Sequence, residues 1–504
     1  MCAAKKLQRL LCGGKALLTP PQGLRPLDMA AMGCIMAACF FLFQFGDLDY
    51  GASISYAYLE GHFFDFYRYN KAVLPDMPGS YYLQPIYLLL AVWNVPMKLF
   101  GLTGHTAQGA FKLSVPELAW NKLLLVIFLM LCSIVVYKIA CLVTERHEPA
   151  KMCMFLCASN PLAIYAIFMF GSLDIFGLTF TMLGLYAFLR HKHWRFILWF
   201  SLAIPFKYIA LIPFLPLLLL DEKNVWKILR GLFVAAIPTV FFLALSLLDP
   251  GGADGEALRQ LGAARSPSLD IGPMMRPAVF ALAYLAICLF AHFKIADERQ
   301  RQKYAIMLPL AAMSMIFVCM FWHAQWIILL APWLALALLF SPNRTYSLLF
   351  ETIGSAAWFI RLLHTYAWLS PPGSDEVLLD PSRFGMHNPQ SLLGNFWAGS
   401  PSGYGAVRGF FQGGIMNVGY LIPASILPYV DAALLICLLS PFLLLFMRRK
   451  AATWPTPRLF KTEAGAIRLR CYGGLAAYLL PITAVSAAYA WFPDVLYRVK
   501  EWLT

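Results

Sequence analysis

Three carboxylates stand at the ends of long apolar segments, where a charged side chain needs a partner, water or a function. Asp47 and Asp49 directly follow the first apolar segment, and Asp174 lies between two apolar segments that are joined with almost no loop. An acid at the edge of hydrocarbon is costly to desolvate. Carboxylates that share a cavity can deprotonate a hydroxyl or hold a divalent cation. We therefore expect these three residues to be catalytic, with Asp49 and Asp174 as the ligands if Mg²⁺ or Mn²⁺ is bound.

Either role needs groups that handle negative charge or orient a substrate. Lys207 lies at the turn of a tight pair of apolar segments, and His323 and Gln325 lie in another short turn between two tryptophans. Lysine and histidine can bind a phosphate oxygen or a sugar hydroxyl. With Tyr50, next to the acids, and Arg361, near the end of a later segment, these residues form the expected substrate-binding set.

Each candidate also has a structural alternative. Asp47 and Asp49 could simply cap or solvate the end of a helix, and Asp174 could be an N-cap whose carboxylate accepts backbone hydrogen bonds. Lys207 could extend toward lipid headgroups, and a histidine between tryptophans could be an interfacial residue. The sequence alone leaves these alternatives open.

The composition determines which elements must position these residues. The chain has 504 residues, of which 60% are hydrophobic and only 13% are charged. Runs of about 18 to 23 apolar residues recur from position 29 onward, the length that crosses a bilayer as a helix. These features exclude a soluble enzyme and predict an all-α polytopic membrane protein. The net charge of +14 is spread between the apolar runs, so we expect membrane lipids and no nucleic acid as partners.

Thirteen crossings fit the apolar pattern. They cover residues 29–46, 120–142, 151–170, 174–190, 194–206, 208–220, 227–248, 277–293, 304–321, 326–340, 348–367, 423–447 and 472–491. With a cytoplasmic N-terminal segment, 1–28, the inward loops hold about 25 of the 40 Lys and Arg residues, as the positive-inside rule requires. Asp47, Asp174, Lys207 and His323 then all lie at the outer side.

One apolar stretch does not fit as a crossing. Reading 81–104 as a span would invert every later loop, so we expect a helix lying at the outer membrane surface, with its Trp and Tyr at headgroup depth. It belongs to a long first outer loop, 47–119, within a transmembrane core of residues 29–367. An outer flap, 368–422, and a C-terminal region, 423–504, complete the expected organisation. The cysteines lie in or beside apolar spans, so we expect no structural disulfides.

Several motifs resemble the GT-C fold membrane glycosyltransferases that use polyprenyl- or dolichyl-phosphate sugars, in particular protein O-mannosyltransferases and aminoarabinose transferases. The resemblance spans roughly residues 28 to 335. It rests on Asp47-Leu48-Asp49-Tyr50, Tyr56-Ala57-Tyr58-Leu59-Glu60-Gly61-His62, Asp65-Phe66-Tyr67, Tyr81-Tyr82-Leu83-Gln84-Pro85-Ile86-Tyr87, Lys98-Leu99-Phe100-Gly101, Asn160-Pro161, Gly171-Ser172-Leu173-Asp174 and Lys207. No Trp-Trp-Asp-Tyr-Gly motif and no large C-terminal soluble domain is present, which argues against an oligosaccharyltransferase.

The resemblance implies a role for each matched residue. The general base falls to Asp47 or Asp49, the acid of the second outer loop to Asp174, and the contact with the lipid phosphate to Lys207, while His323 would line the donor site. The implied reaction moves one sugar from a polyprenyl-phosphate donor to a hydroxyl of a glycan, lipid or protein acceptor, with inversion. The competing classes are a lipid-linked glycan flippase, which should show inverted repeats, and a glycan ligase. The scarcity of outer glycosylation sequons and cysteines favours a bacterial cell membrane.

Overall fold

The computed structural model describes residues 19–42, 46–73, 82–102, 113, 115–249, 251, 275–319, 324–367, 418, 421–455 and 462–491. Every regular element in these ranges is helical, which confirms the all-α expectation. The described cysteines are free thiols.

The first half of the chain contributes a group of short helices and then long ones. These are α2 (Pro26–Leu42), α3 (Gly46–Leu59), α4 (Phe66–Val73), α5 (Gln84–Leu99), α6 (Val115–Thr144), α7 (His147–Ala158), α8 (Pro161–Ile164), the π-helix η2 (Tyr165–Phe170), α9 (Asp174–Leu189), α10 (His193–Phe206), the 3-10 helix η3 (Tyr208–Ala210), α11 (Leu211–Asp221) and α12 (Val225–Leu248).

The second half adds further helices around the same core. These are α14 (Met275–Phe293), α15 (Glu298–Cys319), the 3-10 helix η4 (Ala324–Leu330), α16 (Ala331–Ala337), α17 (Arg344–Ala367), the 3-10 helix η6 (Ala424–Ile426), α21 (Leu427–Phe446), α22 (Arg448–Ala451), α23 (Glu463–Arg468), the π-helix η7 (Leu469–Gly473) and α24 (Gly474–Trp491).

Most expected crossings coincide with a helix to within a few residues, because long apolar runs bounded by charges and prolines favour helices of that length. Within the described ranges, α6, α12, α15 and α21 are each long and apolar enough to cross a membrane. The bent pair formed by α7 and α8–η2 would be a fifth span. Membrane-spanning helices are therefore present, and thirteen crossings remain a prediction.

The expected span 151–170 is broken rather than straight. Its two halves meet at an angle of 44°. Pro161 cannot donate a backbone hydrogen bond, so the helix stops before it. The side chain of Asn160 accepts a hydrogen bond from the backbone of Leu162 at 2.9 Å and so caps the new helix. The break changes the direction of the chain before Asp174.

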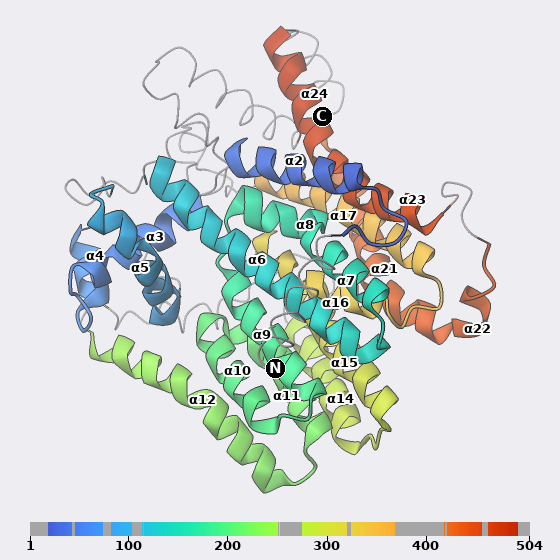
Figure 1. Ribbon diagram of the computed structural model, residues 1–504, viewed down its shortest axis with the longest axis horizontal. Helices are drawn as coiled ribbons and strands as arrows, with labels where there is room; N and C mark the ends of the chain where they lie inside the picture. The colour runs from blue at the N-terminus through green and yellow to red at the C-terminus, as the bar shows by residue number, and fades with distance from the viewer. Residues whose placement is uncertain are drawn as a thin grey trace, which may run out of the picture.

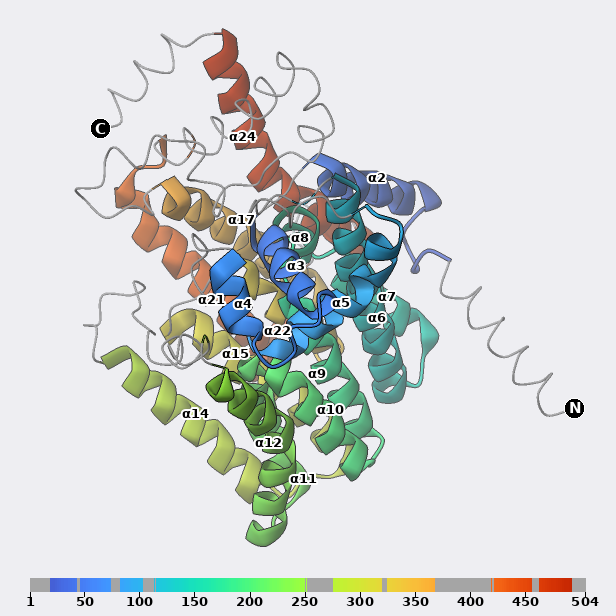
Figure 2. The same ribbon diagram turned by 90° about the vertical axis from the view of Figure 1, so that its left-hand side faces the viewer.

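Helices α3, α4 and α5 form a small module at one end of the bundle (Figure 1). Seen from that end, the module lies in front of the other helices (Figure 2). It has its own hydrophobic cluster, Tyr50, Ile54, Ala57, Tyr58, Phe66, Tyr67, Tyr87 and Ala91. The module contains most of the described residues of the expected first outer loop.

Two reciprocal pairs of contacts join α5 to α6. Trp93 and Trp120 stack with ring centroids 4.4 Å apart, and each indole donates to the other residue's carbonyl oxygen, at 2.9 and 2.8 Å. The side-chain amides of Asn94 and Asn121 exchange two hydrogen bonds of 3.0 Å. A helix is therefore present within 81–104, as α5, and its place at the outer membrane surface stays a prediction. Its Trp93 packs on α6 and its Tyr87 is fully buried, so these rings do not stand free as anchors.

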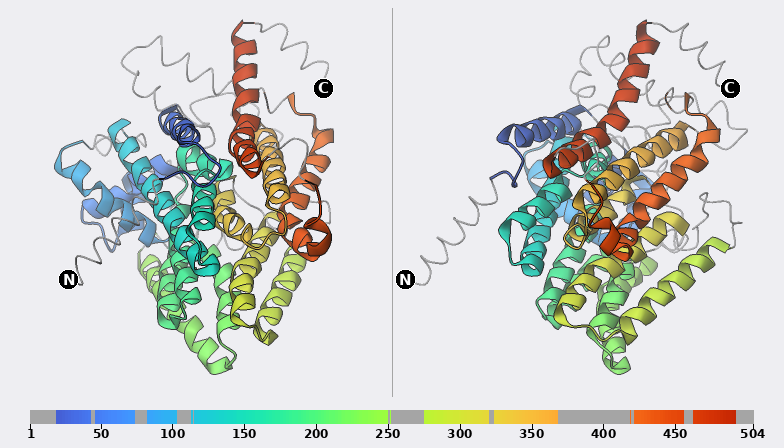
Figure 3. Two further views of the ribbon diagram at one scale, coloured as in Figure 1. Left: turned by 45° about the vertical axis from the view of Figure 1, so that its right-hand side comes forward. Right: turned by 90° about the vertical axis from the view of Figure 1, so that its right-hand side faces the viewer.

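The N-terminal and C-terminal regions lie side by side. In Figure 3, α2 lies across the end of the bundle close to the start of α24, which extends beyond it. Arg468 donates two hydrogen bonds to the carboxylate of Asp28, at 2.9 and 2.8 Å. This contact ties α23 to the first turn of α2 and closes the helical assembly.

Candidate functional site

A buried ion pair between Asp174 and Lys207 forms the centre of the candidate site. Lys207 Nζ lies 2.7 Å from Asp174 Oδ1. The Asp174 side chain has no exposed surface and that of Lys207 is only 7% exposed. The second carboxylate oxygen, Oδ2, accepts no hydrogen bond from the described residues. The acid, expected to be catalytic, and the cation, expected to bind substrate, therefore contact each other directly.

Asp174 reaches this position through a sharp turn. The π-helix η2 ends at Gly171, whose φ of +81° is in the left-handed region that favours glycine. Ser172 Oγ accepts a hydrogen bond from the backbone N–H of Asp174, at 3.3 Å. Asp174 is the first residue of α9 and its carboxylate caps no backbone group, so the N-cap alternative is wrong.

Lys207 lies where the tight helix pair turns. It follows α10, and its extended backbone (φ −155°, ψ 110°) separates α10 from η3. A Cβ on Gly177 would lie 3.2 Å from Lys207 Cβ and 3.4 Å from the Ala203 carbonyl oxygen. Glycine at this position therefore lets α9 and α10 approach closely enough for the ion pair to form. Because Lys207 is buried and paired with Asp174, the alternative in which it extends toward lipid headgroups is wrong.

Two aromatic rings cover the ammonium group. Lys207 Nζ lies 5.1 Å from the ring centroid of Tyr82, just before α5, and 4.6 Å from that of Trp326, in η4. Both distances are in the cation–π range. Sequence analysis did not select either residue for the site, although Tyr82 lies two residues before α5 and Trp326 directly follows Gln325.

The first turn of α3 packs against the turn before Asp174. A Cβ on Gly171 would lie 3.0 Å from Leu48 Cβ, and one on Gly51 would lie 2.7 Å from a methyl group of Leu173. Leu48 stands between Asp47 and Asp49, so the backbone carrying both acids lies beside the Asp174 turn. The side chains of Asp47 and Asp49 are not among those that the structure describes.

The remaining expected residues occupy three different environments. Gln325 is buried beside Trp326, while His323 lies outside the described residues. Tyr50 packs in the core of the α3–α5 module. Arg361, on α17, forms an ion pair with Asp431 on α21, with 3.4 Å between Nε and Oδ1.

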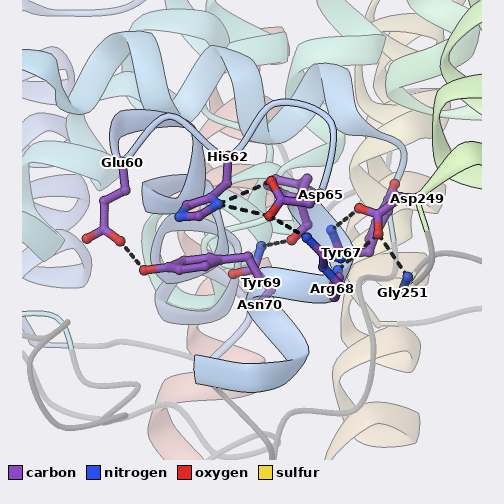
Figure 4. A network of polar contacts seen from close by, with 10 residues as sticks. Glu60, His62, Asp65, Tyr67, Arg68, Tyr69, Asn70, Asp249 and Gly251 are labelled. Atoms are coloured by element: carbon purple, nitrogen blue, oxygen red, sulfur yellow. Dashed lines mark hydrogen bonds and ion pairs between the residues drawn. The ribbon is translucent and has the colours of Figure 1, made fainter.

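Asp249 links the module to the long helices and was missed by sequence analysis. Its carboxylate accepts hydrogen bonds from the backbone N–H groups of Tyr67 (2.5 Å), Arg68 (3.2 Å) and Gly251 (2.8 Å), as Figure 4 shows. It therefore caps α4 from the end of α12. The same view shows His62 stacked on Tyr69, with centroids 3.8 Å apart. The sequence does carry a signal for Asp249, because this acid stands at the end of an apolar segment. The same criterion selected Asp174.

The buried pair offers N–H donors to an anion and one oxygen ligand to a metal ion. An ammonium group has three N–H donors, and one faces Asp174, so the others can bind a second acceptor. Asp174 Oδ2, without a hydrogen-bond donor, is chemically suited to a hard cation such as Mg²⁺. Within the part of the chain that the structure describes, no three His, Cys, Asp or Glu side chains gather into a metal site.

Comparison with known proteins yielded one solved structure. The chain is similar to ArnT from Cupriavidus metallidurans bound to undecaprenyl phosphate, with 14% sequence identity and a TM-score of 0.40. The match covers 89% of this chain and 77% of that one. No protein-family model and no curated protein matches.

Proposed function

We propose that this protein is a GT-C type membrane glycosyltransferase, which moves one sugar from a polyprenyl-phosphate donor to a hydroxyl of a glycan, lipid or protein acceptor. One observation carries the proposal: three segments far apart in sequence meet around the Lys207 ammonium, and a fourth packs beside one of them. They supply Asp174, Tyr82 and Trp326, and the backbone of the first turn of α3 packs beside Asp174. A cation and carboxylates gathered in an apolar helical protein suit a substrate that carries both a phosphate and a lipid.

The chemistry divides between the acids of α3 and the buried pair. Asp47 or Asp49 takes the proton from the acceptor hydroxyl, whose oxygen attacks the anomeric carbon from the face opposite the phosphate. The bond between that carbon and the phosphate oxygen breaks, and the electron pair leaves with the polyprenyl phosphate. A single displacement of this kind inverts the anomeric centre. Lys207 stabilises the charge that grows on the departing phosphate.

In this proposal Asp174 is a positioning residue for Lys207. A lysine side chain has several rotatable bonds, and a fixed ammonium stabilises a transition state better than a mobile one. The ion pair and the two rings hold the ammonium in one place. Asp174 also keeps the resting site neutral, which lowers the cost of burying the lysine.

A divalent cation would add to this charge balance. Asp174 Oδ2 and the expected second ligand, Asp49, are the residues that would hold Mg²⁺ or Mn²⁺. A bound ion would supply further neutralisation of the phosphate. Transfer that survives prolonged EDTA treatment, followed by gel filtration, would contradict this part of the proposal.

The charge distribution supports placing the site at the outer side of the membrane, and the scarcity of outer sequons and cysteines supports a bacterial cell membrane. Most Lys and Arg residues lie in the expected inward loops, which connect the helix ends opposite to the site. Cysteine-labelling of an introduced thiol at position 104 from outside intact cells tests the orientation. Labelling only after permeabilisation would contradict it.

The decisive experiment begins with the lipid that co-purifies with the protein. Mass spectrometry should identify a polyprenyl-phosphate sugar, and that lipid, supplied to the protein in liposomes, should lose one sugar to an added acceptor extract. Asp47→Asn and Asp49→Asn are compared under the same conditions, and we expect only one of them to lose transfer.

Two other outcomes would point to the competing classes. Movement of intact lipid-linked sugar across the bilayer without transfer would indicate a flippase. Transfer of a preassembled glycan in one step would indicate a ligase. Normal transfer by both aspartate variants would defeat the assignment of the base.

A further inference from the structure

A cavity lies between α16, α17 and α21, and neither Asp174 nor Lys207 lines it. Its walls are mostly aliphatic and include Leu334, Leu338, Leu434 and Leu438. Its empty space is about 640 Å³ with the open mouth included.

A carboxylate is among the groups that line this cavity. Glu351 lines the cavity, and its Oε1 accepts hydrogen bonds from Arg470 and, at 2.9 Å, from Asn160 Nδ2. The described residues donate no hydrogen bond to Oε2 of Glu351. The Arg470 side chain has no exposed surface, and its Nε lacks a hydrogen-bond partner within the described ranges. A charged group this deep in an apolar bundle points to a functional site.

The other polar atoms of the cavity are also acceptors. The hydroxyl of Ser355 donates to the Glu351 carbonyl oxygen at 2.9 Å, and that of Ser440 donates to the Cys437 carbonyl oxygen at 2.8 Å. Both serines line the cavity. With their protons engaged, their oxygens can only accept. A ligand that satisfies this wall must therefore bring a hydrogen-bond donor.

Charge balance decides what kind of donor fits. Glu351 and Arg470 already neutralise each other, so a cationic ligand would leave a net buried charge, which is costly. A neutral hydroxyl satisfies Glu351 Oε2 without adding charge, and an aliphatic chain fills the leucine-lined part. We propose that this cavity binds a lipid alcohol, with its hydroxyl donating to Glu351 Oε2 and its hydrocarbon chain against α16 and α21.

Photolabelling of the full-length protein in liposomes tests the proposal. The probe is hexadecanol with a diazirine in its chain, and the control is the methyl ether of the same molecule, which lacks the donor. We expect hexadecanol to label residues 327–355 or 434–441, with competition by unlabelled hexadecanol. The ether should label them about tenfold less, because a lost hydrogen bond to a charged acceptor weakens binding by about that factor or more. Equal labelling by the two probes, or no labelling of these segments, would overturn the proposal.

A matched pair of variants on α21 provides a second test. Leu434→Trp fills the cavity, whereas Ile436→Trp adds the same ring at a side chain that is 50% exposed and does not line it. We expect the first variant to lose the hexadecanol label and the second to keep it. Retention of the label by a folded Leu434→Trp protein would contradict the site. If that variant does not fold, the comparison of alcohol and ether in the unaltered protein decides.

Discussion

Replacing Lys207 with methionine should strongly destabilise the protein, because it leaves the Asp174 carboxylate buried without a counter-charge. Neither side chain is more than 7% exposed, so solvent screens the pair very little. Breaking a buried pair by removing one partner costs about 3–5 kcal/mol. The contacts with Tyr82 and Trp326 are lost as well, which favours the upper part of that range.

The size of the effect can be expressed as a melting temperature. An unfolding entropy of ~2.1 cal/mol/K per residue corresponds to about 1 kcal/mol/K for the whole chain, so Lys207→Met should lower Tm by roughly 3–5 °C. A thiol-reactive fluorescent dye is a suitable probe in detergent, since eight of the described cysteines are buried. Asp174→Asn combined with Lys207→Met removes both charges and should recover most of the loss.

The double variant also separates structure from function. It should be folded and yet fail to transfer sugar, because the cation that meets the phosphate is gone. The reasoning would be refuted if Lys207→Met melted within 1 °C of the unaltered protein. It would equally be refuted if the double variant were no more stable than Lys207→Met alone.

Three further predictions concern the surroundings of the site. Gly171→Ala should lower the free energy of unfolding by about 1–2 kcal/mol, because alanine strains the left-handed backbone at this position. The new methyl group should also displace Leu48, so both Tm and turnover should fall. The control is Gly101→Ala, which has φ +64° and open space around the new methyl group and should lower Tm without affecting turnover. Asp249→Ala removes the cap of α4 and should lower the stability of that helix by about 0.5–2 kcal/mol. Backbone hydrogen exchange across residues 66–73 should become faster, and unchanged exchange would contradict the capping role of Asp249. Hydrogen bonds from the following backbone N–H groups lower the pKa of Glu222 below its ordinary 4.5, so its stabilisation is present above pH 4.5 and lost as the pH falls through the lowered pKa. Glu222→Gln should therefore lower Tm at neutral pH, and the difference in Tm between this variant and the unaltered protein should become smaller in acid. A difference that does not change with pH would contradict this.

The positions of the helices could be predicted because they depend on local pattern. Apolar run length and charge placement predicted α6, α9, α10, α12 and α14 closely. The bend after Asn160 depends on a single proline within an apolar run, and such a run is equally compatible with a straight helix. Helix α5 was predicted as a surface element from charge alone, whereas its pairing with α6 needed coordinates.

The site was predictable as a set of residues but not as a set of contacts. Acids and a lysine at span ends attract attention because burying them is costly. The contacts themselves depend on the close approach of α9 and α10 at Gly177. This approach brings Lys207 to Asp174 and places it beneath two aromatic rings, Tyr82 and Trp326. Asp249 was missed for the same reason, since its partners lie about 180 residues away.

Binding of undecaprenyl phosphate and undecaprenol to the protein in nanodiscs, measured with excess hexadecanol to fill the cavity between α16, α17 and α21, tests the central claim most directly. We expect the unaltered protein to bind the phosphate at least tenfold more tightly than the alcohol, since the lost contact is a charge-assisted hydrogen bond. The Lys207→Met, Asp174→Asn double variant should bind the two lipids equally. A double variant that keeps the full preference for the phosphate would contradict a phosphate site at Lys207.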